Sequence, residues 1–393
     1  MKHILNRNLK YLQEKKIYFS HKDKIETALH ALNKEKIIIV SGVRHAGKTK
    51  FLADFLQKTG KQKETFYYNH DLDMLGEISE RKHLEDILQV FEKDYGNPKI
   101  IALQNCSKIE GIKTFIQDIY KQKKYKIILV GNNIQIEWVT DIEIFPLSFA
   151  LSREEKIENF LHFGGFEEVH LVRDTAFRRF VLESLKNDII SGNIMETYNI
   201  KNRDSFVKML VFLGLNGTYI TQRELQRELS KNGIDISLIT MMEYLSAALN
   251  SKILKKMYQF DIKKNKEIQT QIKYYFSDVG FRHALTYGEW KEQFQRENML
   301  YNELLQKWYE IYGMVNGRFE MNFSARKGKR TLNLHFHYSN EKNELKKDAH
   351  KMEKLWNHGE NILIVSDISL YHLRTPEIDG VRVMELSELL KII

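Results

Sequence analysis

The chain has 393 residues, of which 42% are hydrophobic and 29% charged, and its formal net charge is +9. This composition excludes a disordered protein, and no apolar run approaches the ~18 residues that a membrane-spanning helix needs. The length predicts two or three domains, and the basic charge permits a polyanionic partner. The single cysteine, Cys106, excludes an internal disulfide framework. Because the N-terminus also lacks the apolar core of a signal peptide, we expect a cytoplasmic protein with no membrane partner.

Residues 35–149 alternate short β-type runs with helical stretches. The runs are IIIV (37–40), TFYYN (65–69), KIIALQ (99–104), KIILVG (126–131) and IEIFPL (142–147). Such alternation predicts a parallel sheet that is covered by helices. The first part of the chain is therefore expected to be an α/β domain.

The first of these runs is followed by a phosphate-binding pattern. Its residues match G-x-x-x-x-G-K-[ST] between a strand and a helix, and they are Gly42, Val43, Arg44, His45, Ala46, Gly47, Lys48 and Thr49. Glycines let successive backbone N–H groups surround a phosphate, and the following helix N-terminus adds its positive dipole end. Lys48 would reach the β- and γ-phosphates, and the Thr49 hydroxyl would hold Mg²⁺. An ordinary glycine turn is the alternative, but the complete pattern in this context predicts that the chain binds ATP and Mg²⁺.

The acids that hydrolysis requires are missing from their expected place. One acid normally helps to hold Mg²⁺ and a second polarises the attacking water, and both should follow the buried strand 99–104. The sequence has Gln104 and Asn105 there, and these amides carry no charge and accept no proton at neutral pH. Asp71 and Asp73, after the strand 65–69, are the nearest acidic substitutes, although a polar turn is the simpler interpretation of them. We therefore expect ATP binding with little or no hydrolysis.

The middle of the chain has the pattern of a winged helix. From residue 151 to about 250 the apolar residues follow a helical period, and two strand-like runs joined by a charged turn come next. Within residues 206–275 the helices are expected over TQRELQRELSKNG and ISLITMMEYLSAALNSK, before the two strands of the wing. The second helix offers no Arg or Asn to read base edges, so sequence-specific recognition of DNA is not expected from it.

The predicted wing is basic. Between Lys252 and Lys273 the chain has seven lysines against two acids. Lys263, Lys264 and Lys266, at the charged turn, are the candidates for contact with nucleic-acid phosphates. Packing of this module against neighbouring segments is the alternative to DNA contact.

About the last hundred residues combine a helix around ENMLYNELLQKWYEIYG with the strand candidates TLNLHFHY and NILIVSD. His335 and His337 lie at i and i+2 on the first of these strands, and hence on one face. A metal site there is conceivable, but no third ligand is in register. A surface or cross-strand role is therefore favoured.

The order of these motifs resembles a prokaryotic AAA-like ATPase family that carries a P-loop domain, a winged helix and a C-terminal restriction-endonuclease-like domain. The family's phosphate loop reads G-x-R-R-x-G-K-[ST]; Arg44 is kept here and His45 replaces the second arginine. Its D-E-I-Q strand end aligns with Gln104-Asn105-Cys106-Ser107, and its G-S sensor aligns with Gly131-Asn132-Asn133. The resemblance implies that the metal-binding and catalytic acids are absent, whereas Asn132 could still hydrogen-bond a phosphate.

Other motifs of the family are kept outside the ATP site. They are Pro146–Phe149, Phe163–Glu168, Asp188-Ile189, Tyr275–Phe281, Glu297-Asn298 and Asn302–Leu304. In the nuclease-like part, Glu303 matches the family's early acid, but the E-I-D-F pattern aligns with residues 331–334 and places Asn333 at the aspartate. No strand-borne Glu-x-Lys follows. The resemblance thus implies a nuclease fold without the acids that hold Mg²⁺.

We predict four segments on this basis: a P-loop nucleotide-binding domain (1–150), a helical lid-like segment (151–205), a winged-helix domain (206–285) and a degenerate restriction-endonuclease-like domain (286–393). The favoured function is an ATP-binding pseudo-ATPase that acts as a nucleotide-gated assembly or DNA-associated protein, with a second copy or another protein as partner and with no nuclease activity. The alternative is a slow ATPase that uses an acid from elsewhere in the chain or from a neighbouring subunit. A structural remnant that binds no nucleotide is the third hypothesis.

Overall fold

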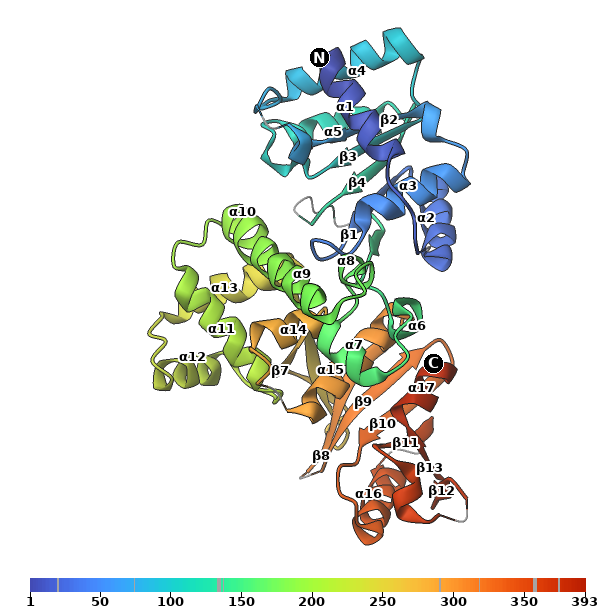
Figure 1. Ribbon diagram of the computed structural model, residues 1–393, viewed down its shortest axis with the longest axis vertical. Coiled ribbons are helices and arrows are strands. Elements are labelled where there is room, and N and C mark those ends of the chain that lie inside the picture. The colour runs from blue at the N-terminus through green and yellow to red at the C-terminus, as the bar shows by residue number, and fades with distance from the viewer. Residues whose placement is uncertain are drawn as a thin grey trace. The chain divides into compact units, whose positions relative to one another are not determined.

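The computed structural model describes residues 1–19, 21–73, 75–132, 136, 138–289, 291–317, 319–355, 359–373 and 375–393. The chain forms two compact units, Met1–Phe145 and Pro146–Ile393 (Figure 1). None of the described helices is long and apolar enough to cross a bilayer. The predicted division into four segments remains a prediction.

The first unit is built on a parallel sheet of five strands in the order β2-β3-β4-β1-β5. The strands are β1 (Ile37–Ser41), β2 (Thr65–Asn69), β3 (Ile100–Gln104), β4 (Lys126–Val130) and β5 (Asp141–Glu143). The main helices are α1 (Lys2–Gln13), α2 (Lys22–Glu35), α3 (Lys48–Lys58), α4 (Arg81–Tyr95) and α5 (Ile112–Lys121), and η2 (His70–Leu72) and η3 (Cys106–Lys108) are short 3₁₀ turns. The predicted parallel sheet is confirmed.

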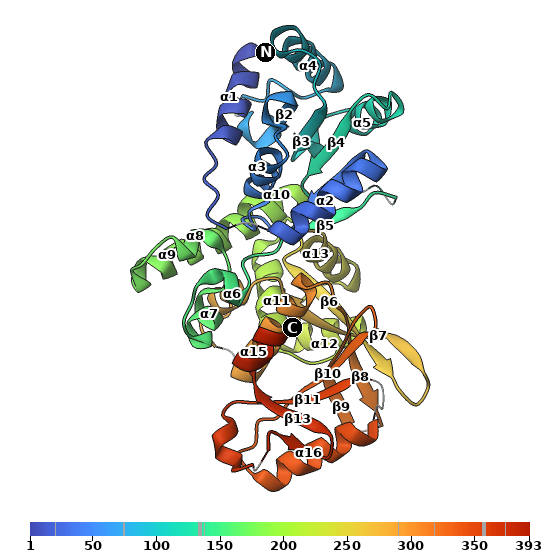
Figure 2. The same ribbon diagram turned by 90° about the vertical axis from the view of Figure 1, so that its right-hand side faces the viewer.

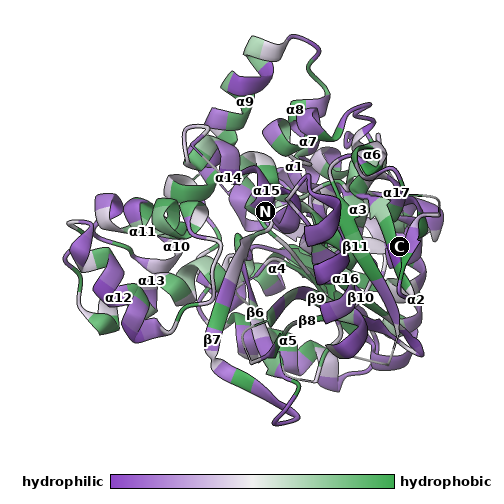
Figure 3. Ribbon diagram, turned by 90° about the horizontal axis from the view of Figure 1, so that it is seen from below, coloured by the Kyte–Doolittle hydropathy of each residue, from purple (hydrophilic) through white to green (hydrophobic). Residues whose placement is uncertain are grey.

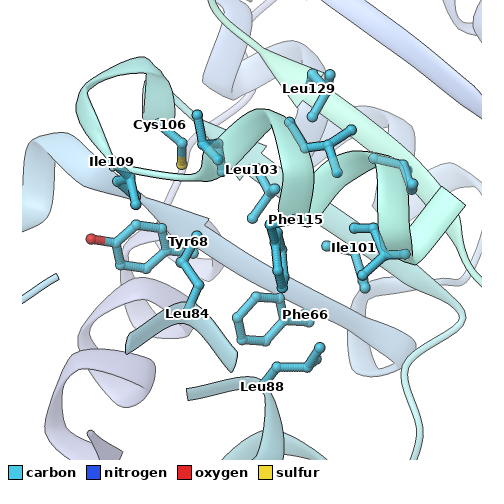
Figure 4. Packing of buried hydrophobic residues seen from close by; sticks show 14 of the residues in the cluster. Phe66, Tyr68, Leu84, Leu88, Ile101, Leu103, Cys106, Ile109, Phe115 and Leu129 are labelled. Atoms are coloured by element: carbon cyan, nitrogen blue, oxygen red, sulfur yellow. The ribbon is translucent and has the colours of Figure 1, made fainter. Parts of the chain in front are cut away.

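Both faces of this sheet are buried, which explains its continuous apolar runs. One face contributes Ile37, Ile39, Phe66, Tyr68, Ile101, Leu103, Ile127 and Leu129 to a single core. Residues of α1, α4 and α5 pack into the same core, and Figure 4 shows Phe115 of α5 beside Phe66 and Leu103. Because β1 and β3 both pair with β4 in parallel, the carboxyl ends of these strands lie at one edge of the sheet, where ligands of parallel sheets usually bind.

The second unit begins with helices. They are α6 (Phe149–Ser152), α7 (Ile157–Phe163), α8 (Glu167–His170), α9 (Thr175–Asn187), a π-helical segment η4 (Asp188–Met195), α10 (Glu196–Tyr198), α11 (Arg203–Leu215), α12 (Gln222–Lys231) and α13 (Leu238–Asn250). The Thr221 hydroxyl accepts from the Glu224 N–H and the Glu224 carboxylate accepts from the Thr221 N–H, a capping box that fixes the start of α12. The order α11, α12, α13 and then a hairpin is the order that the winged-helix prediction requires.

An eight-stranded sheet follows, in the order β12-β13-β11-β10-β9-β8-β6-β7. Its strands are β6 (Leu254–Asp261), β7 (Lys266–Phe276), β8 (Glu310–Asn316), β9 (Phe319–Lys327), β10 (Arg330–Phe336), β11 (Glu360–Val365), β12 (Glu377–Ile378) and β13 (Val381–Glu385). Helices α15 (Glu292–Gln306) and α17 (Leu386–Ile392) share a core with one face, and α16 (Lys342–Leu355) shares a core with the other. The helix α14 (Val279–Leu285) and the 3₁₀ turn η5 (Ile368–Tyr371) complete the unit.

The hairpin β6–β7 is hydrogen-bonded to the C-terminal strands. Strand β6 pairs with β7 antiparallel and with β8 in parallel, so the predicted wing is the last part of the eight-stranded sheet. In Figure 2 the tip of this hairpin, drawn in yellow, projects beyond the other strands. The predicted boundary between residues 285 and 286 therefore crosses one continuous sheet.

Candidate nucleotide-binding site

The phosphate loop begins where β1 ends and finishes where α3 begins. Gly42 has φ 138°, and a Cβ there would lie 2.1 Å from the Ile144 carbonyl oxygen, so this position requires glycine. Gly47 is left-handed, with φ 93°, and the space beside it is open. The first residue of α3 is Lys48, so the N–H groups of the first helical turn face the loop. The geometry suits a phosphate at a helix N-terminus.

The Lys48 ammonium lies over the loop that would hold the phosphates. Its Nζ donates to the carbonyl oxygens of Gly42, at 2.8 Å, and Val43, at 2.9 Å. Burial lowers the pKa of Lys48 to about 8; Arg44 lowers it as well, and Asp71 and Glu143 oppose the shift. An anion bound in the loop would favour the charged ammonium and raise the pKa of Lys48 again.

Gln104 occupies the place of the expected metal-binding acid. The Thr49 hydroxyl donates to Gln104 Oε1 at 3.2 Å, and Gln104 Nε2 lies 2.9 Å from the same hydroxyl. The Tyr67 hydroxyl donates to Gln104 Oε1 at 2.8 Å. The end of β3 therefore lies next to Thr49 of α3, as the sequence predicts. The side chain that it places there is a neutral amide, which hydrogen-bonds to both Thr49 and Tyr67.

Asn105 contacts the carboxylate of Asp71, one of the two acidic substitutes that the sequence offers. Its Nδ2 donates to Asp71 Oδ2 at 2.7 Å, and Arg44 of the phosphate loop lies 3.8 Å from the same oxygen. Asp71 follows β2, whose last residue, Asn69, pairs with Gln104 in the parallel sheet. The structure thus places Asp71 next to two residues of the site. Asp73 instead accepts backbone N–H groups further along its own turn, at 3.0 and 2.7 Å.

Asn132 contacts the phosphate loop directly. Its Oδ1 accepts from the Gly42 N–H at 2.9 Å, and its Nδ2 donates to the Gly42 carbonyl oxygen at 3.0 Å. This double hydrogen bond joins the end of β4 to the start of the loop. Asn133, the other half of the sensor motif, lies outside the described residues.

The family motifs outside the ATP site meet in a buried polar junction of the second unit. Gly165 donates to Asp278 Oδ2 at 2.6 Å, and the Leu147 N–H donates to the Gly165 carbonyl oxygen at 2.7 Å. Asn298 Oδ1 accepts from the Phe276 N–H at 3.0 Å, and its Nδ2 donates to the Phe276 carbonyl oxygen at 2.7 Å. These motifs therefore hold helices and strands of the second unit together.

The residues expected at a nuclease site are engaged elsewhere. Glu303 Oε1 accepts from the Phe149 N–H at 2.6 Å, and burial raises the pKa of Glu303 to about 7. Asn333 is fully buried, accepts from the Ser324 hydroxyl at 3.1 Å and donates to Asn361 at 2.9 Å. Neither residue is placed as a metal ligand.

Strand β9 carries a second match to the E-I-D-F pattern. Its residues Glu320-Met321-Asn322-Phe323 again have asparagine at the aspartate position. The Asn322 Oδ1 accepts from the Phe336 N–H at 3.0 Å. In either alignment, asparagine stands where the resembled family has aspartate.

His335, in β10, and His337, just after this strand, are not grouped with a third metal ligand among the described residues. His337 Nδ1 lies 2.7 Å from Asp348 Oδ2, and Lys351 donates to the other oxygen of Asp348 at 3.0 Å. Burial lowers the pKa of His335 to about 4. In the part of the chain that the structure describes, no three His, Cys, Asp or Glu side chains are grouped so that they could hold a metal ion. A surface or cross-strand role was expected, whereas His337 is buried and contacts Asp348 of helix α16.

The candidate nucleic-acid contacts lie at the tip of the hairpin. Lys263, Lys264 and Lys266 are all exposed, and Figure 3 shows a mostly hydrophilic tip. Lys264 forms an ion pair with Asp261 at 3.4 Å. On α13, the side chains of Ile239 and Met242 are 72% and 44% exposed, so this helix presents apolar groups where a base-reading helix would present donors.

Comparisons with known proteins agree with the fold of the first unit. Residues 34–150 match the family model of an AAA domain, and residues 154–292 match a family described as a domain of unknown function (DUF8612). An uncharacterized protein of Haemophilus influenzae is 22% identical over 398 residues, which cover 94% of this chain and 98% of that protein. The uncharacterized protein MJ1544 of Methanocaldococcus jannaschii is 24% identical over 330 residues, which cover 77% of this chain and 66% of that protein.

Among solved structures, the Walker-type ATPase PABY2304 of Pyrococcus abyssi aligns with 70% of this chain and 99% of its own, with 12% identity and a TM-score of 0.47. The replication initiator DnaA, bound to AMPPCP and single-stranded DNA, aligns with 58% of this chain and 87% of its own, with 15% identity and a TM-score of 0.28. The phosphate loop, at residues 42–49, lies within the part of the chain that matches an AAA domain.

Proposed function

We propose that the protein binds ATP and hydrolyses it very slowly or not at all, so that the bound nucleotide sets a conformation. The observation that carries this proposal is the hydrogen-bonded pair of Gln104 and Thr49, at 2.9 Å, where a carboxylate is expected. A neutral amide neither anchors Mg²⁺ by charge nor accepts a proton from water.

The residues present fit the phosphates of ATP better than they fit Mg²⁺. The phosphate loop offers Lys48 and a helix N-terminus, and the two carbonyl contacts of Lys48 can be exchanged for phosphate oxygens. For Mg²⁺ the site offers the Thr49 hydroxyl and the amide oxygen of Gln104, without a carboxylate at the strand end. When bound, Mg²⁺ would neutralise part of the negative charge of the phosphates, and the Thr49 hydroxyl would be one of its ligands.

A nucleotide can gate the protein only if it prefers one of two conformations. Lys48 supplies such a difference, because its ammonium contacts Gly42 and Val43 now and would contact phosphate in the ATP complex. Asn132 is bonded to the same Gly42, so a change at the loop reaches the end of β4.

Parallel titration of ATP and measurement of phosphate release test the proposal. Wild type should bind ATP and release almost no phosphate in single-turnover conditions, and Lys48→Ala should lose most of its ATP affinity. Lys50→Ala, which removes a lysine from the same helix, is the matched control. Restoring both acids with Gln104→Asp and Asn105→Glu should raise turnover. Rapid wild-type turnover that Lys48→Ala abolishes would refute the pseudo-ATPase.

The second candidate is a slow ATPase in which Asp71 replaces the missing acid. It is favoured by the 2.7 Å hydrogen bond between Asn105 and Asp71, which brings a carboxylate beside the strand end. In that case Asp71→Asn should abolish the residual phosphate release without weakening ATP binding, whereas Asp86→Asn, on α4, should change neither. Equal residual rates in all three proteins would exclude Asp71.

We also propose a DNA-associated role without cleavage. The exposed lysines Lys263, Lys264 and Lys266 suit phosphate contact, and binding should then weaken steeply with salt on every sequence. Neutralising all three should weaken binding to all duplexes alike.

The acids of the proposed nuclease-like core are absent or engaged, so plasmid DNA should stay intact in Mg²⁺ or Mn²⁺. Cleavage that Glu303→Ala abolishes would contradict this. A second copy or another protein stays a proposed partner.

A further inference from the structure

A cavity of about 730 Å³ lies in the second unit beside the β6–β7 hairpin. Residues of the hairpin, of β8 and of the segment before α12 line it, among them Gln259, Tyr219, Lys263, Asp261 and Glu320. The cavity is lined by none of the residues assigned to ATP. It therefore needs an explanation of its own.

Irregular strand pairing opens the hairpin at this place. Tyr258 of β6 pairs with Ile272 of β7, whereas the next residue, Gln259, pairs with Ile268. Residues 269–271 consequently lie outside the ladder between the two strands, and Gln271 lines the cavity. Bulges of this kind bend a strand and redirect side chains, often next to functional sites.

Two buried polar groups that line the cavity lack hydrogen-bond partners among the described residues. Gln259 is 5% exposed, and its Nε2 meets no acceptor. The Tyr219 hydroxyl is also buried and unpaired. Leaving a buried donor unpaired destabilises the folded protein, so two such donors at one cavity point to a group that binds there in the functional state.

The two groups lie on the same face of the sheet. Gln259 pairs with Gly313 of β8, and residues paired across neighbouring strands share a face. A Cβ on Gly313 would lie 1.5 Å from the Tyr219 hydroxyl, so the tyrosine occupies the space that a side chain at Gly313 would fill. Because Gly313 has no side chain, the Tyr219 hydroxyl fits against it, and this position is next to Gln259 on the neighbouring strand.

Both groups can donate to an anion. Burial, and then the carboxylates Glu297 and Glu320, raise the pKa of Tyr219, so its hydroxyl keeps the proton. The exposed Lys263 lines the cavity as well and adds a positive charge. The other lysines there are already paired, Lys273 with Glu297 at 2.5 Å and Lys264 with Asp261 at 3.4 Å.

We propose that this cavity binds a phosphate group, with Gln259 Nε2 and the Tyr219 hydroxyl donating to its oxygens and Lys263 supplying charge. The phosphate could belong to a free polyphosphate or to the end of a nucleic-acid strand. The site is separate from the phosphate loop and does not require the ATP function. Glu320 also lines the cavity, and no ion pair between it and a lysine is found among the described residues. Its negative charge should oppose a bound anion, so removing that charge tests the proposal.

Binding is measured by calorimetry on full-length Lys48→Ala protein, so that the phosphate loop does not contribute. The probes are inorganic pyrophosphate and a short 5′-phosphorylated single-stranded oligonucleotide. Lys263→Gln and Gln259→Leu should each weaken binding about tenfold. The matched controls are Lys256→Gln, on the strand that precedes the turn with Lys263, and Gln269→Leu, in the same hairpin; both should leave binding unchanged.

Glu320→Gln should strengthen binding, because it removes a negative charge beside the anion. Binding of pyrophosphate with these effects supports a free polyphosphate, and binding of the oligonucleotide alone supports a strand end. The proposal is overturned if neither probe binds, if the controls weaken binding as much as the test variants, or if Glu320→Gln weakens it. Because Lys263 is exposed, Lys263→Gln should fold normally. Its effect on phosphate binding therefore tests the proposal even if Gln259→Leu does not fold.

Discussion

Lys48 makes the affinity for ATP dependent on pH. Burial lowers its pKa to about 8, so above that pH the ligand-free protein holds a neutral amine. Phosphate binding favours the charged form, and the proton must then be taken up from solvent. We therefore expect ATP affinity to be constant just below pH 8 and to fall by up to about tenfold per pH unit above it. Calorimetric titrations between pH 7 and 9.5 measure this.

Lys48→Arg separates this effect from other titrations. A guanidinium stays charged throughout the range, so the variant should show a flat profile even if its affinity is lower. Asp71 and Glu143 oppose the shift at Lys48, so Asp71→Asn should move the wild-type fall to lower pH. A wild-type affinity that does not change up to pH 9.5 would show that Lys48 is not the group that binds phosphate.

The nucleotide site was predictable where its residues are contiguous. The phosphate loop is one unbroken motif, and the position of Gln104 follows from its place at the end of a buried strand. The contact between Asp71 and Asn105 was less predictable, because it depends on the parallel register that pairs Asn69 with Gln104. That register brings the segments after β2 and β3 side by side. The only local signal was an acid two residues after a strand.

At the scale of elements, Glu303 joins α15 to α6 through its hydrogen bond to the Phe149 N–H at 2.6 Å. Burial raises the pKa of Glu303 from 4.5 to about 7, so the folded protein binds a proton that the unfolded chain releases between these values. The contribution of Glu303 to stability is therefore fully present below pH 4.5 and is lost as the pH rises through that window, by roughly 3 kcal/mol. Urea unfolding followed by circular dichroism at pH 5 and pH 8 measures the difference.

Glu303→Gln keeps the carbonyl acceptor for Phe149 and removes the titration. The variant should lose most of the pH dependence and be more stable than wild type at pH 8. The exposed Glu310→Gln is the control and should follow the wild-type profile. Asp278, whose pKa burial raises to about 6, acts in the same direction and leaves a smaller slope. Parallel profiles for wild type and Glu303→Gln would contradict the assignment.

The fold of the second unit was harder to predict from sequence than that of the first. In the first unit, buried strands alternate with helices, so local patterns already imply a parallel sheet. The pairing of β6 with β8 joins residues more than fifty positions apart, and no local periodicity encodes it. The polar junction around Asp278 is similar, because Gly165 and Asp278 become partners only in the folded chain.

The chain as a whole places its proposed ligand sites in two units, Met1–Phe145 and Pro146–Ile393. ATP belongs to the first of these units, whereas the hairpin lysines and the phosphate cavity belong to the second. A nucleotide-gated protein requires that ATP binding changes the second unit, since an equal affinity for two states shifts neither of them. If ATP binds without gating the protein, binding should change the first unit alone.

Hydrogen–deuterium exchange with and without ATP distinguishes these cases. ATP should slow exchange at residues 42–49, where Lys48 leaves its carbonyl contacts for phosphate, and in the neighbouring turns at 70–73 and 105–108. If the nucleotide gates the protein, exchange in the β6–β7 hairpin should change as well. Lys48→Ala should abolish both effects, and Lys50→Ala should retain them. Protection confined to the first unit while ATP is bound would refute gating and leave only nucleotide binding.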